Sequence, residues 1–247
     1  MKQAYYSRMG FLIPMALFLV SIFAGSSFAG DFNTSKPIPT PEMMQALLWR
    51  NSELNDFKLE GLLRTAKNKY LIVLRTKGRV MQYEFLEIPL QIRVQMTPAG
   101  SIIERREKSS QPWKVLTPQE KLERVVDSDI YYEDLGVDFT RWEDVKPLGW
   151  DSILTFDTWV YEARPTEISN YAKARFWISS KFEALLRVDA YNKANKVIKR
   201  VEVHSVMDID GLFSIKEMEI ATMIPDRDIS SSRTYIEIHK GTKGSGL

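Results

Sequence analysis

The sequence predicts a mainly β protein, a curled antiparallel sheet of about ten strands with a few short helices against its concave face. Three observations favour this fold class. Segments of alternating apolar and polar residues recur along most of the chain, turn-forming residues separate them, and few stretches carry helix-start signals. A large sheet with one apolar face needs a cover, so we expect the helices to lie against that face.

The strands follow from the period-two alternation of side chains. Within residues 90–96, Ile92 and Val94 share one face and Arg93 lies on the other, so the first two are expected inside and Arg93 in water. The other predicted strands are residues 57–63, 70–76, 80–86, 101–107, 150–163, 172–179, 184–191, 197–206, 213–224 and 233–239.

Helix-start signals occur at two places. Thr40 can cap a helix over residues 41–51, which has proline at its first position and apolar residues at helical spacing. Thr117, followed by proline, repeats the signal and predicts a short helix. Residues 130–143 are expected to form one or two short turns.

The N-terminus has the pattern of a secretory signal peptide over residues 1–29. Two basic residues precede an apolar run over residues 9–24, and small residues occupy positions 27 and 29. The run is short for a bilayer span, and no cysteine follows it to carry a lipid. We expect a soluble periplasmic protein without a lipid anchor; the alternative is a retained N-terminal helix.

The rest of the chain is expected to form one domain. Residues 30–40 are predicted to be an extended leader, residues 41–240 the domain, and residues 241–247 a flexible tail. Removing residues 1–29 leaves 32 basic and 32 acidic residues, a net charge of zero. A nucleic-acid partner would need a basic surplus, so nucleic acid is excluded, and we expect a monomer.

Composition also excludes most recognisable enzyme chemistry. The chain has no cysteine and only two histidines, His204 and His239, which leaves no thiolate nucleophile or multi-histidine metal centre. His204 and Ser205 are strand neighbours that point to opposite faces, which is poor geometry for an acyl-transfer pair. We therefore expect no catalytic residues, no cofactor and no metal.

The segment over residues 129–135, Asp-Ile-Tyr-Tyr-Glu-Asp-Leu, matches a D-x-x-Y-E-D-L motif, and shorter matches follow in order. These are Phe176-Trp177-Ile178, Leu186-Arg187-Val188, Tyr191-Asn192, Lys196-Val197-Ile198-Lys199 and Ile209-Asp210-Gly211-Leu212-Phe213. With them the chain resembles the outer-membrane lipoprotein-sorting-like proteins, a group named for an uncharacterised treponemal protein and related in fold to LolA and LolB. The resemblance covers roughly residues 55–240.

The resemblance implies a half-open β-barrel whose helices form a lid over an apolar cavity. In LolA and LolB that cavity holds the acyl chains of a lipoprotein in transit. The implied function is a periplasmic carrier or chaperone for lipid or lipoprotein acyl chains, sorting them toward the outer membrane. The alternative is a non-catalytic accessory protein that binds an inner-membrane exporter or another envelope complex, with the cavity reduced or filled.

Candidate cavity residues are those whose position on a strand or turn can face such a cavity; they are Ile92, Val94, Tyr132, Leu135, Trp142, Trp159 and Trp177. Each can equally be an ordinary core residue. Glu133 and Asp134 can be read as an acid pair, but adjacent residues on a helix do not face each other. A capping or solvated role is the alternative for both.

Overall fold

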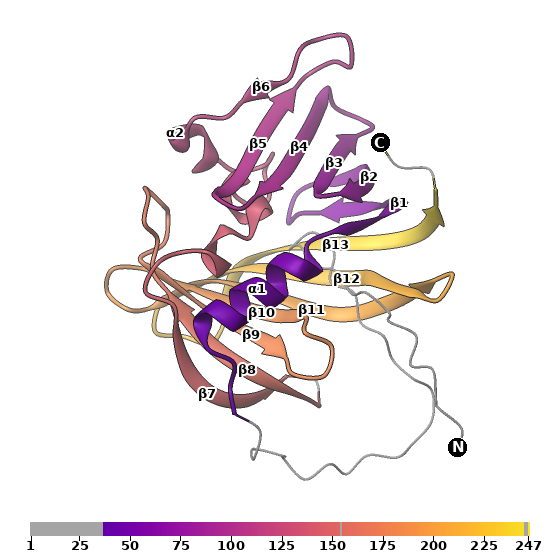
Figure 1. Cartoon of the computed structure of the whole chain (residues 1–247). Coiled ribbons are helices and arrows are strands. Elements are labelled where there is room, and N and C mark those ends of the chain that lie inside the picture. The colour runs from indigo at the N-terminus through magenta and orange to yellow at the C-terminus, as the bar shows by residue number, and fades with distance from the viewer. Residues whose placement is uncertain (1–36, 154, 245–246) are drawn as a thin grey trace, which may run out of the picture.

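The computed structural model of the protein describes residues 37–153, 155–244 and 247. In this part of the chain, 13 antiparallel strands form one open sheet with the order β6-β5-β4-β3-β2-β1-β13-β12-β11-β10-β9-β8-β7 (Figure 1). The predicted fold class is confirmed. The expected signal peptide, and the expected leader up to residue 36, lie outside the described residues.

The helical elements are short. They are α1 (Pro41–Asn51), α2 (Pro118–Lys121) and two 3₁₀ turns, η1 (Tyr132–Gly136) and η2 (Asp138–Thr140). The strands are β1 (Leu54–Arg64), β2 (Lys69–Gly78), β3 (Val80–Phe85), β4 (Leu90–Thr97), β5 (Gly100–Arg106), β6 (Lys114–Val115), β7 (Lys146–Ile153), β8 (Phe156–Ala163), β9 (Lys173–Ser179), β10 (Leu185–Tyr191), β11 (Val197–Ile209), β12 (Leu212–Met223) and β13 (Ser230–Lys243).

The helices begin where the sequence predicts them. The hydroxyl of Thr40 accepts a hydrogen bond from the backbone N–H of Met43 at 3.3 Å, which caps α1. The buried face of α1 carries Met44 and Leu48, which join the main apolar core. No helix in the described part of the chain has the length and apolar character that crossing a membrane requires.

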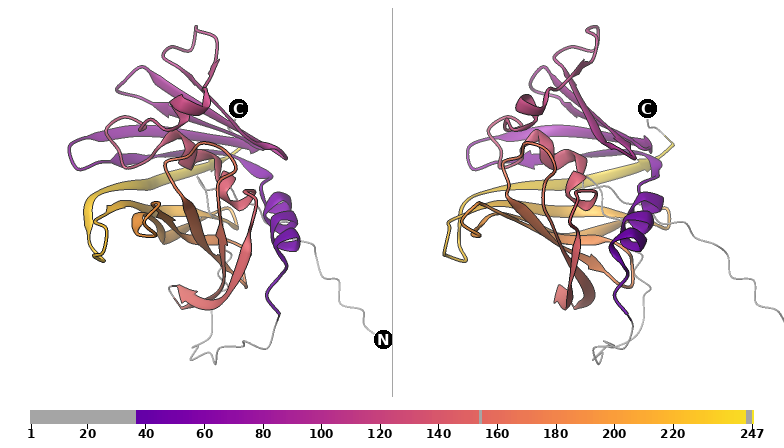
Figure 2. Two further views of the ribbon diagram at one scale, coloured as in Figure 1. Left: turned by 90° about the vertical axis from the view of Figure 1, so that its left-hand side faces the viewer. Right: turned by 60° about the vertical axis from the view of Figure 1, so that its left-hand side comes forward.

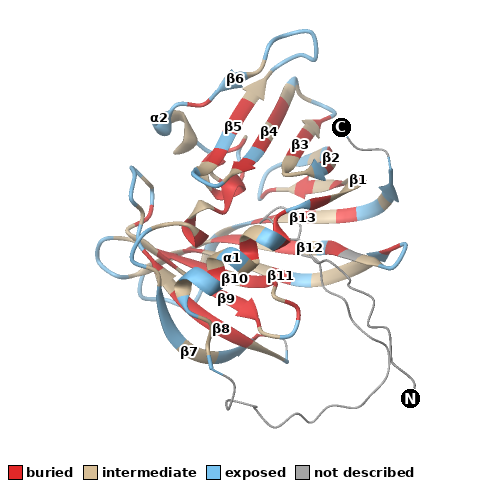
Figure 3. Cartoon of the chain, viewed as in Figure 1, coloured by how far each residue is buried: buried red, intermediate tan, exposed pale blue. Residues whose placement is uncertain are grey.

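The sheet curls around its covering segments. Figure 2 shows η1 and η2 inside the curve and α1 along its open side. Buried and more exposed residues alternate along most strands, as Figure 3 shows. The inward positions form one continuous apolar core, in which the rings of Tyr161 and Phe176 stack at 5.8 Å.

Two strand boundaries differ from the sequence prediction. The segment expected as one strand over residues 150–163 is two, β7 and β8, which pair with each other. Thr155 between them has a φ of 75°, a left-handed conformation that interrupts an extended strand. At the other end, β13 continues through Lys243 and pairs with β1, whereas the sequence predicts a flexible tail from residue 241.

Gly241 lies in close contact with a neighbouring strand. A Cβ at Gly241 would lie 2.2 Å from Cδ1 of Ile209, so the glycine makes room for the end of that side chain. From sequence alone, the glycines of this segment indicated a flexible end.

Candidate functional site

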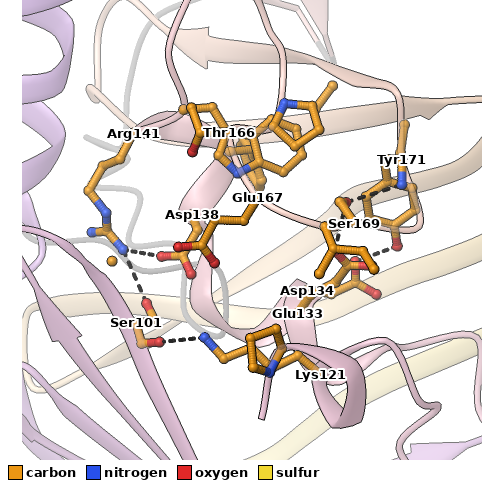
Figure 4. Close-up of a pocket in the computed structure, with 18 of the residues that line it drawn as sticks. Ser101, Lys121, Glu133, Asp134, Asp138, Arg141, Thr166, Glu167, Ser169 and Tyr171 are labelled. Carbon is orange, nitrogen blue, oxygen red and sulfur yellow. Dashed lines mark hydrogen bonds and ion pairs between the residues drawn. The ribbon is translucent and has the colours of Figure 1, made fainter. Parts of the chain in front are cut away.

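A cavity of about 400 Å³ lies between the concave face of the sheet and the segments that cover it. Strands β9, β10 and β11 contribute to its floor, and the β4–β5 hairpin and α2 line one side. The segment containing η1 and η2 and the loop over residues 164–170 complete the walls. Figure 4 shows the charged and polar residues that surround it.

The floor of the cavity is apolar and is formed by short side chains. It consists of Ala174 on β9, Val188 and Ala190 on β10, and Val201 on β11, all buried. Small side chains at neighbouring inward positions leave space above three adjacent strands. Apolar lining of this kind, with a few convergent polar groups, is typical of a site for a small ligand.

The D-x-x-Y-E-D-L segment is tied to the sheet at its first residue. The carboxylate of Asp129 accepts hydrogen bonds from the hydroxyls of Thr222, Ser232 and Thr234 at 2.5, 2.5 and 3.0 Å. The backbone N–H of Asp129 also donates to the Thr234 hydroxyl at 2.8 Å. These bonds anchor the start of the segment to β12 and β13.

The second acid of the motif forms a buried ion pair at the cavity wall. The Asp134 carboxylate accepts from the ammonium of Lys199 at 2.5 Å, from the hydroxyl of Tyr171 at 2.6 Å and from the backbone N–H of Tyr131 at 2.7 Å. Burial lowers the pKa of Lys199, and the nearby Asp134 opposes that shift. The ring of Tyr131 lies 3.9 Å from the ammonium. Asp134 thus has the capping role that the sequence left open.

Glu133 holds the loop over residues 164–170 against the cavity. Its carboxylate accepts from the hydroxyl of Ser169 at 2.7 Å and from the backbone N–H of Asn170 at 3.1 Å. No lysine, arginine or histidine nitrogen of the described chain reaches it within ion-pair distance. Burial raises the pKa of Glu133, and the adjacent negative charge of Asp134 adds to this. Glu133 is therefore a partly buried carboxylate with hydrogen bonds but no ion-pair partner among the described residues.

Two cations approach Ser101 on the opposite side of the cavity (Figure 4). The ammonium of Lys121 donates to the backbone carbonyl of Ser101 at 3.0 Å. The guanidinium of Arg141 donates to the Ser101 hydroxyl at 3.1 Å and pairs with Asp138. Together these contacts connect β5 with α2 and with the segment that follows η2.

One predicted cavity residue lines this cavity, and four others, besides Trp159, belong to the main core. Trp142 is the lining residue, and its ring packs edge-on against Phe139. The core residues are Ile92, Val94, Tyr132 and Leu135. Their burial agrees with the predicted strand and turn faces, but they do not line the cavity, and their binding of lipid stays a prediction.

Trp159 and Trp177 occupy opposite faces of the sheet. Trp159 packs in the main core beside Trp150, with ring centroids 6.2 Å apart. Trp177 belongs to a separate small cluster, and its indole N–H donates to Asp151 at 2.9 Å. The guanidinium of Arg187 lies 4.7 Å from the centre of the Trp177 ring. The structure therefore does not bring these two tryptophans together at the cavity.

Sequence reasoning missed Lys199, Lys121, Arg141 and the loop over residues 164–170. The sequence pattern could have indicated Lys199, because it lies two residues from Val201 and therefore on the same inward face of the strand. A lysine on an apolar strand face needs a buried partner. The loop carries no periodicity, so nothing in its pattern indicated that it covers a cavity.

The described residues gather no three histidine, aspartate or glutamate side chains that could hold a metal ion. His204 is half-exposed on β11, and its ring nitrogens lie 4.0 Å from carboxylates of Glu217 and Glu219. The cavity has the features of a binding site: its floor is apolar, its walls carry charged side chains, and a loop covers it.

Comparison with solved structures identifies similar folds. A DUF1329 family protein from Desulfovibrio piger matches with a TM-score of 0.63 and 15% identity, covering 84% of this chain and 91% of that chain. An outer membrane lipoprotein-sorting protein domain from Vibrio parahaemolyticus matches with a TM-score of 0.64 and 16% identity, covering 78% and 87%. A LolA superfamily protein from Nitrosomonas europaea gives 0.54 and 15%, covering 76% and 86%.

No curated protein sequence matches the chain significantly. A family model described as "Uncharacterized protein" matches residues 108–246, more than half of the chain. This match and the shared fold confirm the resemblance to the outer-membrane lipoprotein-sorting-like proteins. The chain therefore belongs to the family of uncharacterized proteins whose model it matches, and its fold is similar to those of the lipoprotein-sorting domain and the LolA superfamily protein.

Proposed function

We propose that the protein is a non-catalytic carrier of the cell envelope, which binds lipid or the acyl chains of lipoproteins in its cavity for sorting toward the outer membrane. The cavity carries this proposal. It has about 400 Å³ of space over an apolar floor, and each methylene of an acyl chain buried there contributes about 0.8 kcal/mol. The shared fold of lipoprotein-sorting domains supports the same assignment.

The cavity also bears on the choice between carrier and accessory protein. An accessory protein that only docks on an exporter needs no internal space, and a filled core would favour it. An open cavity above Ala174, Ala190 and Val201 favours the carrier instead. The carrier would work in the periplasm after removal of residues 1–29.

A substitution that fills the cavity tests the proposal. Ala190 lies in the floor with 3% of its surface exposed, so Ala190→Phe places a ring where the chain would lie. We expect affinity for a fluorescent fatty acid to fall about tenfold or more, which corresponds to about 1.4 kcal/mol or the loss of about two buried methylenes. Ala194→Phe is the matched control, because Ala194 is exposed in the β10–β11 turn.

Folding is checked separately, since an added ring can cost about 1–3 kcal/mol by overpacking. Urea denaturation of both variants shows whether each remains folded under the binding conditions. Wild-type protein that binds no acyl probe, or equal binding by the two folded variants, contradicts the proposal. Native mass spectrometry of the protein from envelope extract would identify a co-purifying lipid or lipoprotein.

A further inference from the structure

The charged groups around the cavity divide into those that neutralise each other and those that do not. Asp134 pairs with Lys199, and Asp138 pairs with Arg141. Each pair satisfies charge within the wall. A ligand that enters the cavity gains little from them, because their strongest hydrogen bonds are already made.

Three charged groups that line the cavity form no ion pair among the described residues. Glu133 accepts from a hydroxyl and a backbone N–H, and Glu167 is exposed on the covering loop. Lys121 donates only to a carbonyl. Figure 4 shows Lys121 on the other side of the cavity from Glu167. Glu133 lies near Asp134 and Ser169, apart from Glu167, so the wall offers one ammonium and two separate carboxylates.

The partly buried Glu133 carboxylate is costly to keep ionised without a cation, and a ligand of complementary charge removes that cost. The ligand must therefore satisfy both signs at one end and supply hydrocarbon for the apolar floor at the other. A volume of about 400 Å³ is near the lower end of ligand pockets, which suits one chain and its head group.

We propose that the cavity binds a zwitterionic single-chain amphiphile, with its ammonium group beside Glu133, its phosphate beside Lys121, and its chain over Ala190 and Val201. This rests on the proposed function, since it assumes that the floor holds an acyl chain. It goes further by assigning a head-group chemistry that a cavity selecting only hydrocarbon would not distinguish.

The test compares four amphiphiles with one acyl chain in common. They are lysophosphatidylethanolamine, which carries both charges, lysophosphatidylglycerol, which is anionic, an acylcholine ester, which is cationic, and a neutral monoacylglycerol. Displacement of the neutral fluorescent probe phenylnaphthylamine from the full mature protein gives each affinity. We expect the zwitterionic compound to bind about tenfold more tightly than the neutral one, and the two singly charged compounds to lie between.

Two variants assign the selectivity to the named residues. Glu133→Gln should lower affinity for the zwitterionic and cationic compounds about fivefold or more and leave the neutral compound unchanged. Lys121→Met should lower affinity for the zwitterionic and anionic compounds by a similar factor and leave the neutral compound unchanged. Glu143→Gln and Lys193→Met, both exposed and outside the cavity, are the controls. Urea denaturation of each variant confirms folding.

The outcomes separate the two proposals. Binding of all four compounds with equal affinity would keep the acyl-chain cavity and overturn the head-group assignment. Tightest binding of the anionic compound would overturn it as well. Failure of all four, including the neutral monoacylglycerol, would contradict the proposed function itself. Equal losses for the neutral and the charged compounds in Glu133→Gln would mean that Glu133 only shapes the loop.

Discussion

Single residues explain why the D-x-x-Y-E-D-L segment has its polar pattern. Its acids do not act as a pair: Asp129 binds three hydroxyls of the sheet, Glu133 holds a loop, and Asp134 neutralises Lys199. Each acid thus joins the segment to a different part of the fold. A buried ion pair adds little net stability over apolar residues, but loss of one partner is costly because the other charge is left buried and unpaired.

Lys199→Met tests that asymmetry. The methionine preserves the length of the side chain but leaves Asp134 buried without its cation. We expect the free energy of unfolding to fall by about 3–5 kcal/mol, measured by urea denaturation. Lys216→Met, at an exposed position on β12, is the control and should change stability by less than about 0.5 kcal/mol. A loss below about 1 kcal/mol for Lys199→Met would refute the structural role of the pair.

Glu133 should give stability a pH dependence. Burial raises its pKa above the ordinary value of 4.5, so folding favours the protonated carboxyl. Its contribution is fully present below the unfolded pKa and is lost as pH rises through the folded pKa. Compared with wild type, Glu133→Gln should therefore lose less unfolding free energy between about pH 4.5 and about pH 7. Parallel stability curves for the two proteins, measured by urea denaturation at each pH, would argue against this assignment.

At the scale of elements, the junction of β1 and β13 joins the two halves of the sheet. The register shifts between Glu60 and Gly61, because β13 carries one extra residue, His239, opposite this point of β1. A Cβ at Gly61 would lie 2.2 Å from the backbone carbonyl oxygen of Glu237. The two strands can approach this closely only because position 61 has no side chain.

Gly61→Ala should therefore force β1 and β13 apart. We expect a loss of about 1–3 kcal/mol in unfolding free energy, the usual range for overpacking. Gly241→Ala is the comparison, because its Cβ would meet the flexible end of the Ile209 side chain rather than backbone, and a smaller loss is expected. Thermal or urea denaturation measures the stability of both variants. An unchanged stability of Gly61→Ala would mean that β1 and β13 can move apart without cost.

Local pattern was enough to predict most elements but not the cavity. Alternation correctly put Ile92 and Val94 on the buried face, and the capping signals at Thr40 and Thr117 correctly marked two helices. Inward position does not distinguish core from cavity lining, because that depends on what packs above each strand. Val94→Asn would therefore damage the core rather than a ligand site. Arg93, expected in water, instead forms a two-point ion pair with the buried Glu104 on the outer face.

For the whole molecule, the described residues begin at Pro37, after the expected signal peptide. In the described part of the leader, Ile38 packs against the apolar core, and the Tyr161 hydroxyl donates to the carbonyl of Pro39 at 2.8 Å. Met44 of α1 is the first fully buried residue of the core along the described chain. Cleavage after Ala29 would therefore leave every described contact of the sheet and cavity intact.

Processing after Ala29 is the prediction that connects this fold to export. Signal peptides are cleaved after small residues, which the chain has at Ser27 and Ala29. N-terminal sequencing of the exported protein should begin at Gly30, within a residue or two. Ala29→Phe should block cleavage and leave Met1 on a membrane-associated protein, because a large ring replaces the small residue beside the cleaved bond. Phe28→Leu lies between the two small positions and should be processed normally. Recovery of wild-type protein with Met1 in the membrane fraction would instead support the retained helix, and the carrier would then work from the membrane surface.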